Sequence, residues 1–249
     1  MAKQLLVYET AVPLSPARHA GQSVEVGRSF SFSAGVNAVP LMAVEILRAA
    51  REYAVVFTGD GADVMPAVVL GVQGDQNLYL GSEGQWTASY IPAFIRRYPF
   101  IFASSTDGKT LTLCIDEAYP GLNKDGRGER LFAYDGSPTP YIERVLDFVK
   151  EYQTQFVQTQ AFGRRLYELD LLEPMQAQVS TPAGAKLSLS GFMVVNRRRL
   201  RALGPAQLHA LMQSDSLELA YLHLHSMRNF NDVKNRLIGD LASHERAAA

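Results

Sequence analysis

The order of strand and helix signals along the 249-residue chain predicts an α+β fold. Short apolar and β-branched runs, separated by turns rich in Gly, Pro and Asp, fill the first half. From residue 139 onward, apolar residues recur mostly at helical spacing. We therefore expect a strand-rich N-terminal half with a mixed or antiparallel sheet, and a helix-rich C-terminal part packed on it.

The strand predictions follow from apolar runs and from alternation between polar and apolar residues. Alternation from Ser23 to Phe32 is typical of a half-buried strand. Asp107-Gly108 between two apolar runs is a strong hairpin signal, which joins residues 99–104 to residues 109–116. Further strands are expected at residues 3–9, 54–58, 66–72, 77–80 and 186–195, the last of them after a turn at residues 179–184.

The helix predictions rest on apolar periodicity and on residues typical of helix starts. Thr139 as N-cap and Pro140 in the first turn open a long helix that ends before Pro174, with a bend at Gly163. Shorter helices are expected at residues 40–53, 90–98, 197–201 after an Asn196 cap, 205–212, and from Ser214 or Asp215 toward the end. No linker forces a domain boundary, so we expect one domain over residues 1–240 and a frayed tail over residues 241–249.

The composition excludes several function classes. The net charge is -1, with 47% hydrophobic and 20% charged residues, so no global field attracts nucleic acid. Cys114 is the single cysteine, so neither an intramolecular disulfide nor a cysteine-based zinc site can form. His223 and His225 point to different faces if they lie on a helix, so they cannot share a metal ion there. No phosphate-binding loop or dinucleotide motif occurs, and we predict neither a metal nor a cofactor.

The hydropathy pattern predicts a chain that does not enter a membrane. A spanning helix needs about 20 successive apolar residues, and the longest runs here are much shorter. The N-terminal apolar run also lacks the length and cleavage site of a signal peptide. We therefore expect a cytoplasmic protein.

Two candidate positions come from loops and strand ends. His19 lies beside Arg18 in a Pro-rich loop, where we favour an anchoring hydrogen bond over catalysis. Asp116 and Glu117 follow a strand directly, at a place that often faces a cleft, although a solvated strand end is the simpler interpretation. Cys114 lies within an apolar strand, where a buried and unreactive thiol is the default.

Residues 86–100 contain the richest group of aromatic and basic side chains. This segment holds the sole tryptophan, Trp86, together with Tyr90, Tyr98, Arg96 and Arg97. Aromatic side chains with a polar end are common both in cores and in binding surfaces, and arginine stacks on their rings. From the residues alone, a core segment with a surface anchor is favoured over a ligand pocket.

The same segment resembles the central signature of the bacterial SapC family. The signature is carried by Gly84-x-Trp86, Tyr90-Ile91-Pro92-Ala93 and Arg96-Arg97-Tyr98-Pro99-Phe100. Other blocks agree in order: Val12–Ser15 with Arg18-His19, Asn37–Leu41 with Glu45 and Tyr53, Pro66-Ala67 with Leu70-Gly71, Asn77-Leu78, Cys114–Glu117 and Gly191-Phe192. The family often has Pro after the tyrosine, where this chain has Ala54. The resemblance spans roughly residues 5 to 238.

The resemblance implies kinship more than activity. The family takes its name from a protein associated with a paracrystalline surface layer, and members are found near genes for halogenase-like flavoproteins, cupin-like proteins and outer-membrane receptors. It supplies no catalytic set that can be assigned residue by residue. Some members carry the label of a peptide-transporter permease, which the absence of a spanning segment argues against.

Three hypotheses follow. The leading one is a non-enzymatic accessory protein that binds a protein partner, such as a halogenase-like or cupin-like neighbour or a surface-layer component, through Trp86, Tyr90, Arg96, Arg97 and Tyr98. The second is an enzyme or small-molecule binder for a peptide or amino-acid-like substrate, in which His19, Arg97 and Asp116 converge in a pocket. The third is an assembly protein that associates with itself.

Overall fold

The computed structural model describes residues 6–105, 109–180, 184 and 186–248. Its strands are β1 (Ala11–Pro13), β2 (Ser23–Val24), β3 (Ala38–Pro40), β4 (Val55–Thr58), β5 (Met65–Val69), β6 (Phe100–Ser104), β7 (Leu111–Asp116), β8 (Leu122–Asn123), β9 (Glu129–Arg130), β10 (Leu172–Ser180) and β11 (Lys186–Val195). Its α-helices are α1 (Pro16–His19), α2 (Ile46–Ala49), α3 (Ala93–Arg96), α4 (Pro140–Glu168), α5 (Arg197–Arg201), α6 (Pro205–Gln213), α7 (Ser216–Ser226) and α8 (Phe230–Ala248). The 3-10 turns are η2 (Ser31–Ser33), η3 (Ala43–Glu45), η4 (Gly61–Asp63) and η5 (Met227–Asn229).

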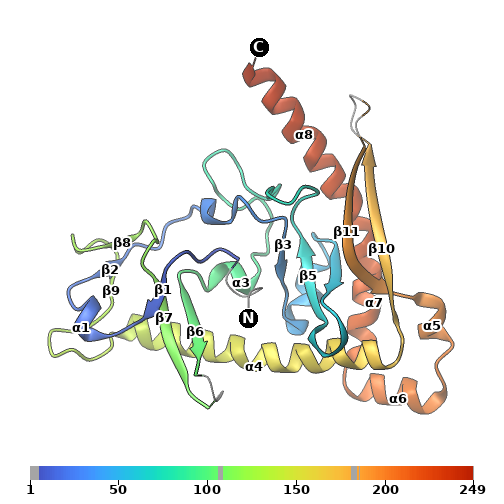
Figure 1. Cartoon of the computed structure of the whole chain (residues 1–249), viewed down its shortest axis with the longest axis horizontal. Helices are drawn as coiled ribbons and strands as arrows, with labels where there is room; N and C mark the ends of the chain where they lie inside the picture. The colour runs from blue at the N-terminus through green and yellow to red at the C-terminus, as the bar shows by residue number, and fades with distance from the viewer. Residues whose placement is uncertain (1–5, 106–108, 181–183, 185, 249) are drawn as a thin grey trace.

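The strands form three antiparallel sheets. The largest has the order β10-β11-β4-β5-β3, and the two smaller ones have the orders β1-β7-β6 and β8-β2-β9. Figure 1 shows α4 lying under the smaller sheets at one end and reaching the large sheet at the other. The α+β prediction, with strands early and helices late, is confirmed.

The large sheet is covered on both faces. In β4, Val55 and Phe57 pack into one cluster with side chains of α4 and α7, whereas Val56 and the preceding Ala54 pack into another with α8. Alternate residues of a strand point to opposite faces, so a strand with helices on both sides needs apolar residues at every position. This explains the unbroken apolar run from Ala54 to Phe57.

At one position, the side chain of His223 in α7 replaces the backbone hydrogen bonds between β4 and β11. Met193 of β11 pairs with Phe57 of β4, and the same register would bring Val195 opposite Val55. Instead, the Val195 amide donates to Nε2 of His223 (3.0 Å), and Nδ1 lies 2.8 Å from the Val55 carbonyl. The imidazole is therefore neutral, with its proton on Nδ1.

Acidification should destabilise the protein through His223. Burial lowers the pKa of His223 from 6.5 to about 4, so between these values the unfolded chain binds a proton that the folded chain does not. Stability is then fully present above pH 6.5 and falls as the pH drops, by about 3 kcal/mol at pH 4. Urea unfolding at several pH values measures this slope. His225→Gln, a change at an exposed position, should keep it, and His223→Gln should lose it; equal slopes in both variants would contradict the assignment.

A glycine lets α4 approach the large sheet closely. A Cβ atom at Gly163 would lie 2.0 Å from the carbonyl oxygen of Val64, directly before β5. Backbone cannot yield as a flexible side chain can, so this contact requires glycine. Gly163 lies inside a helix that continues to Glu168.

Gly163→Ala should destabilise the protein, against the usual trend for helices. In the interior of a helix with free space around the glycine, replacing Gly with Ala raises the free energy of unfolding by roughly 0.5–1 kcal/mol. At Gly163 the new methyl group forces α4 away from Val64, and we expect a loss of about 2 kcal/mol or more. Gly239→Ala in α8 is the matched control, because no atom lies within 4 Å of its added Cβ, and it should stabilise. The free energies of unfolding in urea test the pair, and a Gly163→Ala variant as stable as Gly239→Ala would refute the contact.

Several strand predictions are wrong. Residues 6–9 of the strand predicted at residues 3–9 form a turn and a bend, and residues 3–5 lie outside the described residues. Residues 77–80 form a turn and an isolated bridge. The predicted strand at residues 23–32 keeps strand pairing at Ser23–Val24 and one isolated bridge, from Ser29 to Gln85. Phe30 and Phe32 of that segment pack against the rings of Trp86 and Tyr98, so aromatic contacts hold them instead of a β-ladder. The predicted helix at residues 40–53 is reduced to η3 and α2, because Pro40 pairs within β3.

Other predictions are confirmed. Residues 54–58 and 66–72 contain β4 and most of β5, and β6 and β7 form the expected antiparallel pair, whose tip at residues 106–108 lies outside the described residues. Asn196 caps α5 through the Arg199 amide. Thr139 precedes α4 as expected, but its hydroxyl bonds to the Arg130 and Leu131 carbonyls instead of the helix.

The C-terminal segment is helical. α8 runs through residues 241–248, the stretch predicted as a tail, and the division at residue 240 stays a prediction. None of the helices in the described ranges combines the length and apolarity that a bilayer-spanning segment requires.

Candidate functional site

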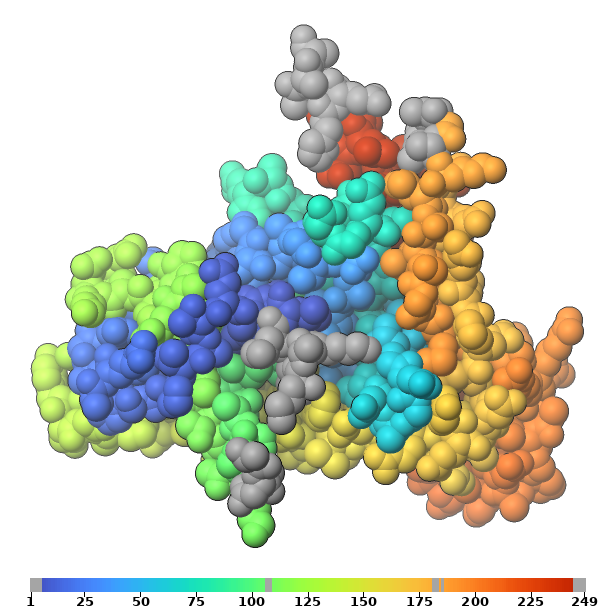
Figure 2. All heavy atoms as spheres, viewed as in Figure 1, coloured from blue at the N-terminus to red at the C-terminus, as the bar shows by residue number. Residues whose placement is uncertain are grey.

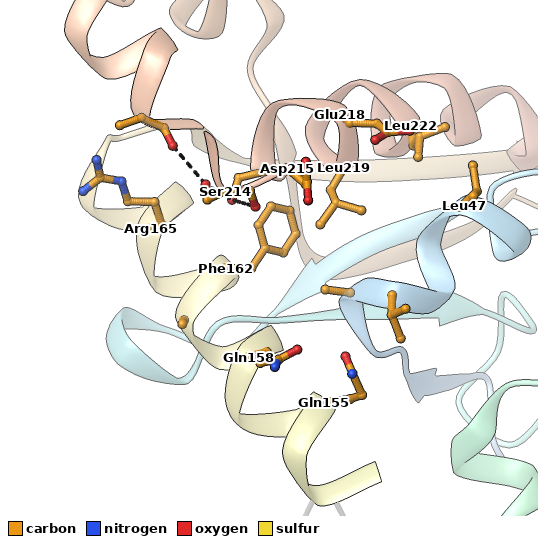
Figure 3. Close-up of a pocket in the computed structure, with 15 residues that line it drawn as sticks. Leu47, Gln155, Gln158, Phe162, Arg165, Ser214, Asp215, Glu218, Leu219 and Leu222 are labelled. Carbon is orange, nitrogen blue, oxygen red and sulfur yellow. Dashed lines mark hydrogen bonds between the residues drawn. The ribbon is translucent and has the colours of Figure 1, made fainter. Parts of the chain in front are cut away.

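The largest hollow described lies beside α4. It has a volume of about 720 Å³ and opens between α4, the η3–α2 segment and the start of α7 (Figure 3). In Figure 3, Phe162 points from α4 toward Leu219 of α7, and Gln155 and Gln158 project from α4 into the same space. Its walls are formed by Ala43, Val44, Leu47, Gln155, Gln158, Ala161, Phe162, Arg165, Ala210, Ser214–Ser216, Glu218, Leu219 and Leu222.

A second hollow continues the first along α4. Its volume is about 450 Å³, and it shares Val44, Leu47 and Gln155 with the larger one. We call the two together the α4 groove. The second part is lined in addition by Met42, Glu45, Arg48, Tyr90, Ala93, Arg96, Phe148, Glu151 and Tyr152.

A buried carboxylate holds the wall of the groove. Glu45 is 5% exposed and accepts hydrogen bonds from the Met42 amide (2.8 Å), the Ala93 amide (2.7 Å) and the Tyr90 hydroxyl (2.6 Å). These bonds turn Glu45 inward and leave its neighbours Val44 and Leu47 on the outside, 62% and 53% exposed. Two large apolar side chains are thus presented to solvent.

Tyr90 and Arg96 meet at one end of the groove. The Arg96 guanidinium lies over the rings of Tyr90 (5.9 Å) and Phe148 (5.3 Å), and its Nε donates to the Ile91 carbonyl (3.0 Å). Burial, followed by the Glu45 carboxylate, raises the pKa of Tyr90, so its hydroxyl remains a donor. Arg96 is exposed and can still bind an acidic group with its other nitrogens.

Trp86 and Tyr98 belong to other parts of the structure. Trp86 is half-buried, donates through Nε1 to the Tyr53 hydroxyl (2.7 Å) and packs against Phe30 and Tyr79. Tyr98 lines a different cavity, described below. The predicted segment therefore does not present a single surface.

Arg97 lies in the core. It is 3% exposed, and its guanidinium packs over the rings of Tyr152 (4.5 Å), Phe94 (4.6 Å) and Tyr8 (5.7 Å). The structure thus gives the two neighbouring arginines opposite environments, with Arg96 outside and Arg97 inside. A partner can reach the first and cannot reach the second.

His19 and Asp116 hold the N-terminal segment in place. Both are fully buried. The Nδ1 atom of His19 lies 3.2 Å from the Ser15 backbone, and Nε2 lies 3.3 Å from Glu117, which also pairs with Arg18.

Asp116 accepts the amides of Glu9 (2.9 Å), Thr10 (2.8 Å) and Ala118 (3.1 Å). None of His19, Arg97 and Asp116 lines a cavity described here. Their convergence in a substrate pocket stays a prediction.

The described residues offer no ready metal or thiol chemistry. Among them, no group of three or more His, Cys, Asp or Glu side chains could hold a metal ion. Cys114 is buried, and burial raises the pKa of its thiol, which lowers its reactivity. The α4 groove itself is lined by apolar, amide and charged side chains.

A family comparison covers most of these elements. The SapC family model matches residues 14–233. The chain belongs to the SapC family. The match extends over both parts of the α4 groove and confirms the resemblance seen in the sequence. No curated protein and no solved structure matches this SapC chain.

The sequence did not reveal the α4 groove. Val44 and Leu47 fit the apolar periodicity of a helix, which predicts burial as readily as exposure. What exposes them is the inward turn of Glu45 toward Tyr90 and Ala93, about 45 residues further along the chain. The available signal was a carboxylate within an apolar helix, which requires buried donors.

The hydroxyl of Tyr152, at the inner wall of the groove, supports a stability prediction. It is buried and has no hydrogen-bond partner among the described residues. Tyr152→Phe removes a polar group that burial penalises, so the free energy of unfolding should rise by about 1 kcal/mol. Tyr8→Phe is the control, because Tyr8 donates to the Phe100 carbonyl (2.7 Å) and its loss should cost about 1 kcal/mol. If urea unfolding shows both variants destabilised alike, the Tyr152 hydroxyl has a partner.

Proposed function

We propose that this SapC-family chain is a non-enzymatic accessory protein that binds an amphipathic helix of a partner protein in the α4 groove. The observation that carries the proposal is the exposure of Val44 and Leu47 on a wall shared by both parts of the groove. Large apolar side chains gathered in a concave surface are typical of protein interaction sites.

The dimensions favour a helix as the occupant. α4 borders the groove from Phe148 to Arg165, which at 1.5 Å per residue is a length of about 25 Å. A helix of similar length has four to five turns, enough for apolar anchors at i, i+3, i+4 and i+7. Two apolar pairs on the groove walls have the same i, i+3 spacing as such anchors, namely Val44 with Leu47 and Leu219 with Leu222.

The charges indicate how the helix is oriented. Arg48 and Arg96 line the end of the groove near Tyr90, and neither has an ion-pair partner among the described residues. Glu218 and Asp215 line the other part together with Arg165, and Glu151 also lines the part near Tyr90. A helix with acidic side chains at the Arg96 end and basic ones toward Glu218 would complement both.

Contacts already made elsewhere argue against the alternative of an enzyme. His19 and Asp116 bind backbone and neighbouring side chains, and Arg97 is enclosed by aromatic rings. Groups used in this way are not available to a substrate without local unfolding. A cytoplasmic location, and a partner from surface-layer or outer-membrane-receptor systems, remain parts of this proposal.

Two variants and a matched control test the groove. Cross-linking to host proteins followed by mass spectrometry identifies the bound segment, and a synthetic peptide of that segment is then titrated by fluorescence anisotropy. Leu47→Glu and Arg96→Glu should each weaken peptide binding at least tenfold, or about 1.4 kcal/mol. Val157→Glu should bind like the unmodified chain, because Val157 is an equally exposed apolar residue on α4 outside the groove.

All three variants alter exposed positions and should keep the melting temperature of the parent. Cross-links that map away from α4, or equal binding by all three variants, would exclude the groove as the docking site. A bound segment without apolar residues at helical spacing would exclude the helical occupant.

A further inference from the structure

A separate cavity lies between the N-terminal segment, residues 25–32 and the loop after β7. Its volume is about 430 Å³, and it shares no lining residue with the α4 groove. Figure 2 shows the N-terminal segment, in dark blue, next to the green residues near 120 on this side of the molecule. The cavity is lined by Val7, Glu9, Glu25, Gly27, Ser29, Ser31, Phe32, Tyr98 and Ala118–Gly121.

Aromatic rings form part of its wall. Tyr98 stacks on Phe32 with their centroids 4.1 Å apart, and Tyr119 meets Tyr98 edge-on at 5.4 Å and 88°. Stacking fixes these rings, so the wall is formed before any ligand arrives. The faces that Phe32 and Tyr98 turn toward each other are filled by the stack, so a ligand meets only the ring surface outside it. Free faces of such rings carry partial negative charge and attract cations.

The charged groups at the cavity are acidic. Glu9 and Glu25 line it, and no lysine or arginine is among the lining residues. Glu25 pairs with Arg127 at 3.0 Å, whereas Glu9 has no ion-pair partner among the described residues. Burial, then the Asp116 carboxylate and then Glu9 raise the pKa of Tyr98, so the field at its hydroxyl is negative.

Two serines complete the polar side of the cavity. The hydroxyls of Ser29 and Ser31 are hydrogen-bonded to each other at 2.9 Å. Gly84 packs against both, since a Cβ atom there would lie 2.4 Å from the first hydroxyl oxygen and 2.1 Å from the second. The hydroxyls are thus held in position as further acceptors near the carboxylates.

We propose that this cavity binds an organic ammonium group, with the aromatic rings of Phe32 and Tyr98 against its alkyl carbons and the Glu9 carboxylate balancing its charge. Aromatic faces beside acidic groups recognise alkylammonium ions, because the charge is spread over carbons that pack on rings. A phosphate or carboxylate ligand would meet the Glu9 and Glu25 carboxylates, and no lysine or arginine lines the cavity itself. The ammonium could come from a small free molecule or from a lysine side chain.

Calorimetric titration of the full chain distinguishes these cases. Choline probes a free quaternary ammonium, N-acetyl-lysine amide probes a lysine side chain, and 3,3-dimethylbutan-1-ol is a neutral molecule with the shape of choline. We expect at least one cation to bind, and the neutral analogue to bind at least tenfold more weakly. Choline binding alone assigns a small free ligand, and binding of the lysine compound alone assigns a peptide side chain.

The carboxylate has its own control. Glu9→Gln should weaken binding of the cation about tenfold, while Glu168→Gln, an exposed change at the end of α4 far along the chain, should leave it unchanged. Absence of binding by both cations, equal binding of the neutral alcohol, or equal affinity of the two variants would each overturn the proposal. None of these results bears on the α4 groove, which is tested with a peptide.

Discussion

The structure depends on one long helix that serves two hydrophobic clusters. Near its start, α4 contributes Ile142 and Val149 to the cluster beneath the smaller sheets. Near its end, Phe162 and Leu166 enter the cluster of the large sheet. Because an α-helix is stiff over this length, it fixes the distance and angle between the two clusters. The sheets could not shift independently without exposing apolar surface at one end.

That arrangement also determines where binding can occur. A helix packed on sheets with one face leaves its other faces to solvent, and short helices such as α2 and α7 cover only part of them. The α4 groove is the space left between these short helices along the same rod. The aromatic cavity has a different origin, because loops from residues 25–32 and the turn after β7 enclose it. Because the two hollows share no lining residue, the binding proposed for each can be tested independently of the other.

The elements that the sequence predicts correctly are those formed by preferences and contacts within a short stretch of chain. β4 was predictable because a strand buried on both faces needs a continuous apolar run, and α4 because Pro140 and 3.6-residue periodicity mark it. The segment from Ser23 to Phe32 shows the opposite case. It alternates correctly for a strand, yet Phe30 and Phe32 find aromatic partners that are distant in sequence. No local pattern reports such contacts.

The same reasoning explains why family kinship is easier to establish than activity. In the segment that carries the resemblance, Trp86 is held by Tyr53, and Arg97 is enclosed by rings, so these residues mainly secure packing. Tyr90 and Arg96 lie between them in the sequence but line the groove. A short motif can therefore combine residues that build the fold with residues that line a groove. Spacing in the sequence does not separate the two classes, and the clearest contrast in burial is between Arg97 in the core and its exposed neighbour Arg96.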